Sequence, residues 1–116
     1  MGFLNDLIAD QVAARSWRVL EPCAYRTRTG YVVVIPEDFE TDLASTPRIL
    51  WPLFPPFGRH TDAAILHDYL YHSQELSRAD ADLEFYEEMA RAGVPFWQRG
   101  LMYAAVRIFG GGFYRG

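Results

Sequence analysis

The chain has 116 residues, of which 50% are hydrophobic and 16% aromatic, so one domain with its own core is expected. A single cysteine, Cys23, excludes an internal disulfide framework. The formal net charge of −4 makes nucleic acid a poor partner. No apolar run approaches the ~18 residues of a membrane span. The N-terminus lacks the basic leader of a signal peptide, so we expect the protein to be cytosolic in the cell that makes it.

The first element expected is a helix over residues 1–16. Its apolar residues share one helical stripe, formed by Phe3, Leu4, Leu7, Ile8 and Val12. Polar residues lie on the other side, which is typical of an amphipathic helix packed on a core or offered to a partner. Residues 17–36 then alternate in strand fashion around a turn at Thr29-Gly30 and predict a small antiparallel sheet of two or three strands.

Residues 37–60 are expected to be irregular, with several prolines and candidate capping groups. Residues 61–110 should then form three helices. The first two, over Thr61 to Met89, are joined by a turn short enough to make them antiparallel. Ser77 followed by Asp80 predicts an N-terminal capping box for the second helix.

Counting outward from Glu75 brings His67 and Asp82 level to within about one residue, at ~1.5 Å rise per residue. A histidine and a carboxylate should therefore face each other across an otherwise apolar helix pair. Asp68 and Tyr71 lie within one turn of His67. This group is the candidate catalytic site, although a buried pair that only fixes the register of the helices would give the same pattern.

The third expected helix, Phe96 to Phe109, is apolar on nearly every side. Such a helix is buried all round by its own chain or is buried in another chain. We therefore expect a contact surface, and its candidate residues are Trp97, Arg99 and Arg107, together with Phe113 and Tyr114 of a flexible tail over 111–116. The complete prediction is an α+β fold in one domain, 1–116.

Over Trp17 to Gly110 the sequence resembles a small family of tailed-phage and prophage proteins catalogued as a domain of unknown function. The shared positions are Phe39, Thr41 to Ser45, Pro47, Arg48, Trp51, Ala63, Ala64, His67 to Tyr71, Arg78, Ala81, Asp82, Met89, Met102, Tyr103, Arg107, Phe109 and Gly110. The resemblance implies phage origin and a gene among the virion genes. The protein would then be made in the host cytoplasm and incorporated into the virion.

A narrower resemblance concerns chemistry. The segment with His67-Asp68, Tyr71 and Asp82 is similar to the core of the phospholipase A₂ fold, and most of all to its viral-capsid versions. The resemblance implies that His67 is the general base, that Asp82 orients its imidazole and that Tyr71 completes the hydrogen-bond network. Asp68 would bind calcium. Asp42 is a second candidate metal ligand, or it only caps a turn. No glycine-rich calcium loop is present; Pro55 to Gly58 contains one glycine.

Two functions remain open from the sequence. One is a structural or assembly component of the virion, in the tail or baseplate, that contacts other virion proteins or itself. The other is a calcium-dependent ester hydrolase of phospholipase A₂ type that acts on host membrane lipid.

Overall fold

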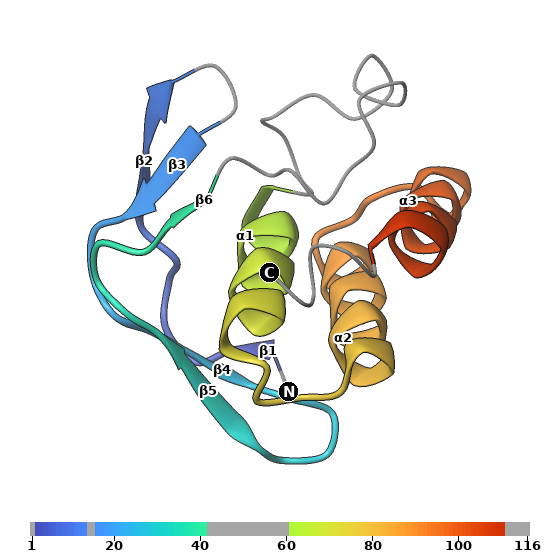
Figure 1. The fold of residues 1–116 in the computed structure, drawn as a ribbon, viewed down its shortest axis with the longest axis horizontal. Helices are drawn as coiled ribbons and strands as arrows, with labels where there is room; N and C mark the ends of the chain where they lie inside the picture. The colour runs from blue at the N-terminus through green and yellow to red at the C-terminus, as the bar shows by residue number, and fades with distance from the viewer. Residues whose placement is uncertain (1, 14–15, 42–60, 111–116) are drawn as a thin grey trace. The chain divides into compact units, whose positions relative to one another are not determined.

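The computed structural model describes residues 2–13, 16–41 and 61–110. They form two compact units, Met1–Asp42 and Leu43–Gly116, and each is described by itself (Figure 1). The first unit holds only strands and the second holds the helices, which confirms the α+β prediction. The strands are β1 (Gly2–Phe3), β2 (Ala9–Ala13), β3 (Ser16–Val19), β4 (Cys23–Arg26), β5 (Val32–Ile35) and β6 (Glu40–Thr41). The helices are α1 (Thr61–Ser73), α2 (Arg78–Arg91) and α3 (Phe96–Phe109).

One antiparallel sheet has the strand order β1-β4-β5. Its β4–β5 hairpin turns at Gly30, whose φ of 93° suits glycine, as the sequence predicts. Burial alternates along both strands, so that Cys23 pairs with Ile35 and Tyr25 with Val33 on the buried face. The run of β-branched residues before Pro36 is therefore buried on one face only, with Val32 and Val34 exposed.

The predicted N-terminal helix is wrong. Within residues 1–16 the structure has β1 and β2 instead, and β2 belongs to a second antiparallel sheet of order β2-β3-β6. Its backbone pairs with β3, for example Ala9 with Val19 and Gln11 with Trp17. Pairing with the next strand satisfies the same backbone groups that a helix would, and tertiary context decides between them. The stripe that suggested a helix leaves Leu4, Ile8 and Val12 exposed.

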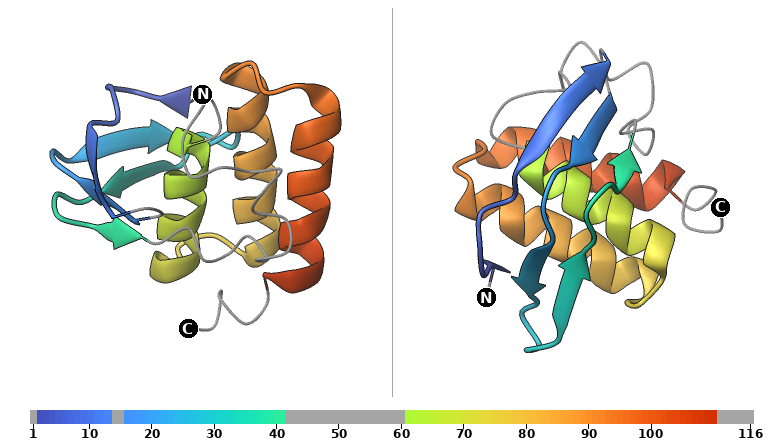
Figure 2. Two further views of the ribbon diagram at one scale, coloured as in Figure 1. Left: turned by 90° about the horizontal axis from the view of Figure 1, so that it is seen from above. Right: turned by 90° about the vertical axis from the view of Figure 1, so that its left-hand side faces the viewer.

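The helical half follows the sequence closely. The short link between α1 and α2 reverses the chain (Figure 2), beginning at Gln74 with φ of 56°. Ser77 is the N-cap of α2, and its hydroxyl accepts a hydrogen bond from the Asp80 amide at 3.2 Å. Gly93, with φ of 85°, follows α2, and Pro95 is the N-cap of α3. None of the described helices is long and apolar enough to cross a membrane.

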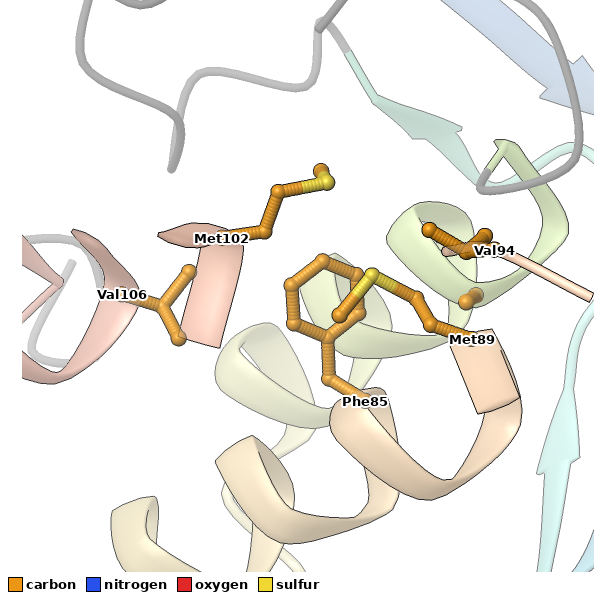
Figure 3. Packing of buried hydrophobic residues seen from close by; sticks show 6 residues of the cluster. Phe85, Met89, Val94, Met102 and Val106 are labelled. Atoms are coloured by element: carbon orange, nitrogen blue, oxygen red, sulfur yellow. The ribbon is translucent and has the colours of Figure 1, made fainter. Parts of the chain in front are cut away.

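The helices share one apolar cluster in which α2 packs against both α1 and α3. It consists of Ala63, Phe85, Met89, Val94, Met102 and Val106, and Figure 3 shows Phe85 and Met89 side by side within it. On α3 the buried residues are Met102, Ala105 and Val106. The other side of α3 is exposed, so this helix is not buried all round by its own chain.

The N-cap of α2 can be tested by Ser77→Ala. Loss of the hydroxyl leaves the Asp80 amide without its side-chain acceptor, and such changes typically cost about 1 kcal/mol. We expect urea denaturation to show that loss. Ser77→Asp, which keeps an acceptor at the cap, should unfold at nearly the wild-type urea concentration, and equal losses in both variants would contradict a capping role.

Candidate functional site

The carboxylate of Asp82, in the first half of α2, is the centre of the candidate site. Its side chain is fully buried and receives hydrogen bonds from groups on the other two helices. On Oδ1, His67 Nε2 lies at 2.7 Å and the Tyr71 hydroxyl at 2.5 Å, both from α1. On Oδ2, Nη1 of Arg107 on α3 donates at 2.9 Å. The predicted proximity of His67 and Asp82 is confirmed.

These contacts set the charge of Asp82. Burial alone would raise the pKa of the carboxyl group, but the hydrogen bonds from His67, Tyr71 and Arg107 outweigh burial and leave the pKa below its ordinary value. The group is therefore an ionised acceptor at neutral pH. A neutral imidazole that donates from Nε2 to this carboxylate keeps a lone pair on Nδ1. Nδ1 of His67 lies 3.9 Å from Oδ1 of Asp68, so Asp68 lies on the Nδ1 side of the ring.

The imidazole is also held by aromatic rings. The ring centroid of Tyr71 lies 4.1 Å from that of His67, and that of Phe85 lies at 4.7 Å. Burial, and next the hydrogen bond to Asp82, raise the pKa of Tyr71, so its hydroxyl stays a proton donor over the whole neutral range. His67 itself is 1% exposed. The orientation of the imidazole is therefore fixed by the hydrogen bond from Nε2 to the Asp82 carboxylate and by packing of the ring against Tyr71 and Phe85.

The C-terminal end of α3 is fastened beside this site by two further groups. On α2, Nη2 of Arg78 donates to the backbone oxygens of Val106, at 2.8 Å, and of Arg107. Both carbonyls belong to the last turn of the helix, and that of Val106 also accepts from the Gly110 amide at 2.9 Å. Gly110 ends the helix, and a Cβ at this position would lie 2.7 Å from the Tyr71 hydroxyl, so a larger residue would collide with the site.

The structure thus brings together His67, Asp82 and Tyr71 as the sequence predicts and adds Arg107. Sequence reasoning assigned Arg107 to a contact surface, since it is far from Asp82 in the chain. The available signal was an arginine within an otherwise apolar helix. Arg99, the other arginine of α3, donates instead to the Val94 carbonyl at 2.9 Å and lies over the Tyr86 ring. Trp97 is 54% exposed.

The proposed calcium site finds little support among the described residues. Calcium takes six to eight oxygen ligands. Asp68 is the one predicted ligand that the structure describes; Asp42 lies outside the described residues, as do the tail residues Phe113 and Tyr114. No group of three or more His, Cys, Asp or Glu side chains that could hold a metal occurs in the described part of the chain. Asp68 by itself supplies too few oxygen ligands for calcium.

The charge of Asp82 predicts how stability depends on pH. Because its folded pKa is lowered, its contribution is present above the unfolded pKa of about 3.9 and is lost as the pH falls through the folded value. Denaturant titrations from about pH 5 downward should therefore show a steeper loss of unfolding free energy for wild type than for Asp82→Asn. The pKa of Glu88, which burial raises, acts in the opposite direction but equally in both proteins. Parallel pH profiles would contradict the prediction.

Comparison with known proteins supplies a family. Residues 17–106 match the family described as "Protein of unknown function (DUF1353)". The chain is 33% identical over 78 residues to "Uncharacterized protein y4jT" of Sinorhizobium fredii (strain NBRC 101917 / NGR234). That alignment covers 66% of this chain but 23% of the relative. No solved structure matches the chain. The family match includes His67, Asp82 and Tyr71 and leaves out Arg107 by one position. The chain therefore belongs to the DUF1353 family.

Proposed function

We propose that His67 and Asp82 form a general-base dyad for ester hydrolysis of phospholipase A₂ type, with host membrane lipid as substrate. One observation carries the proposal: an ionised, buried carboxylate accepts hydrogen bonds from His67 Nε2 and the Tyr71 hydroxyl on the same oxygen. The Tyr71 hydroxyl helps to keep Oδ1 beside the imidazole, and a base of defined tautomer requires an acceptor in that place.

The proposed reaction uses Nδ1, the ring nitrogen of His67 that does not bind Asp82. Nδ1 of His67 takes a proton from a water molecule while the water oxygen forms a bond to the ester carbonyl carbon. The tetrahedral intermediate then expels the alkoxide, which receives the proton back from Nδ1, and the products are a carboxylic acid and an alcohol. Asp82 stabilises the imidazolium that forms between these steps. Since His67 is 1% exposed, the reaction requires a rearrangement that admits water and ester.

A second candidate function is that of a structural or assembly component of a phage virion, in the tail or baseplate. The exposed side of α3 favours it. Trp97, Leu101 and Ile108 are large apolar residues with 54%, 48% and 70% of their surface exposed. Together with Ala104, also exposed, they recur at steps of four, three and four residues, which is the spacing of a helix–helix seam. The partner would be a second copy or another virion protein.

Catalysis is tested by His67→Ala, with His72→Ala on the same helix as the matched control because His72 is exposed. Purified proteins are assayed for release of fatty acid from phospholipid vesicles, with and without calcium. We expect hydrolysis by wild type and His72→Ala and a loss of orders of magnitude in His67→Ala, because the general base is gone. No hydrolysis by wild type in either condition would refute the proposal.

Thermal melts distinguish a base from a register-fixing pair. If the pair is structural, His67→Ala removes a hydrogen-bond donor from a buried carboxylate and should cost on the order of 3–5 kcal/mol. His67→Ala/Asp82→Ala would then be the more stable variant, since no carboxylate is left buried. The catalytic proposal expects His67→Ala to melt near wild type, because Arg107 and Tyr71 still donate to Asp82, and expects the double variant, which loses that acceptor, to be the less stable of the two.

Self-association tests the second candidate function. Sedimentation of the purified protein at increasing concentration should show dimers or larger species, and Leu101→Glu should shift them toward monomer because it places a charge in the apolar seam. Glu87→Gln, on α2 and outside the apolar seam, is the control. A wild-type protein that stays monomeric at high concentration would count against the α3 surface as a self-contact.

A further inference from the structure

We infer that Arg107 is a positioning residue for the His67–Asp82 dyad: its guanidinium holds Oδ2 of Asp82 so that Oδ1 meets the imidazole at Nε2. The inference rests on the proposed function and adds α3 to the site. The two oxygens of the Asp82 carboxylate bind different donors. His67 and Tyr71 both use Oδ1, whereas Arg107 is the donor to Oδ2, at 2.9 Å.

A carboxylate held by one oxygen can still rotate about its bond to Cβ, because the terminal sp² torsion of aspartate is broad. A donor on the second oxygen removes that freedom. The donor, Arg107, has to be held in place as well, and its backbone is held by Arg78. Arg78 binds the carbonyls of Val106 and Arg107, so the residue that holds Oδ2 belongs to a helical turn tied to α2. Asp82 and Arg78 are one helical turn apart on α2.

Gly110 allows this close approach. A Cβ there would lie 2.7 Å from the Tyr71 hydroxyl, so only glycine lets the end of α3 lie against the residue that shares Oδ1 with His67. Both oxygens of Asp82 are therefore set by the same helix end, through Arg107 on one side and through the packing of Tyr71 on the other.

The arginine is not simply part of the core. Its side chain is 38% exposed, whereas that of Asp82 is fully buried. Arg99 provides the comparison, because it also fastens α3, through the Val94 carbonyl and the Tyr86 ring, yet has no contact with Asp82 among the bonds of the described residues. The two arginines thus separate an effect on the dyad from a general effect on helix packing.

The test uses the full chain and nuclear magnetic resonance of the His67 ring. Buried and bonded to Asp82, the Nε2 proton should exchange slowly and give a downfield resonance, with ring ¹⁵N shifts of a single Nε2–H tautomer. In Arg107→Gln that resonance should broaden or vanish and the ¹⁵N shifts should report mixed tautomers. Arg107→Lys, which returns a cationic donor to Oδ2, should restore it. Arg99→Gln should leave it unchanged while lowering the melting temperature.

An unchanged His67 resonance in Arg107→Gln, or an equal change in Arg99→Gln, would overturn the inference. So would a resonance that Arg107→Lys fails to restore, since the loss would then come from packing. Should Arg107→Gln not fold, Arg107→Met takes its place, because it keeps the aliphatic part of the side chain but has no donor for Oδ2; the same outcomes support or overturn the inference. The measurement needs no substrate, so absence of hydrolysis in wild type would reject the proposed reaction and leave this result standing.

Discussion

The helical half of this protein depends on one buried charge. An isolated carboxylate moved from water into a protein interior costs several kcal/mol, so Asp82 is tolerated only because three donors reach it. His67 and Tyr71 come from α1 and Arg107 from α3, while Asp82 itself is on α2. The same requirement therefore fixes the register of all three helices. An apolar cluster alone, with Phe85 at its centre, would tolerate small sliding of one helix along another.

Structural and chemical roles need not exclude each other at this site. The donors that stabilise the carboxylate also keep it ionised, and an ionised carboxylate selects the tautomer of His67 that leaves Nδ1 free. Rings of Tyr71 and Phe85 on the imidazole limit its rotation. What distinguishes the two roles is access, because a base must meet water and substrate, whereas a structural pair works best when sealed. The low exposure of His67 makes access the decisive question for the hydrolase proposal.

The opposite sides of α3 have different physical characters. One side, with Met102 and Val106, completes the apolar cluster, and the end of the helix reaches Asp82 through Arg107. The other side leaves Trp97 and Ile108 exposed. The exposed residues and Arg107 thus belong to the same helix, α3.

The sequence by itself determined the features that depend on local chemistry. The Ser77 cap and the Gly30 turn follow from the chemistry of those residues and the backbone beside them. That His67 and Asp82 lie opposite each other follows from the rise of the helices and the short turn between them. Only the tertiary structure decided the rest. Residues 1–16 carry a helical stripe, but in the sheets β1 pairs with β4 and β2 pairs with β3 instead. Arg107 joined Asp82 because helix packing, which no spacing in the chain encodes, closed the distance between them.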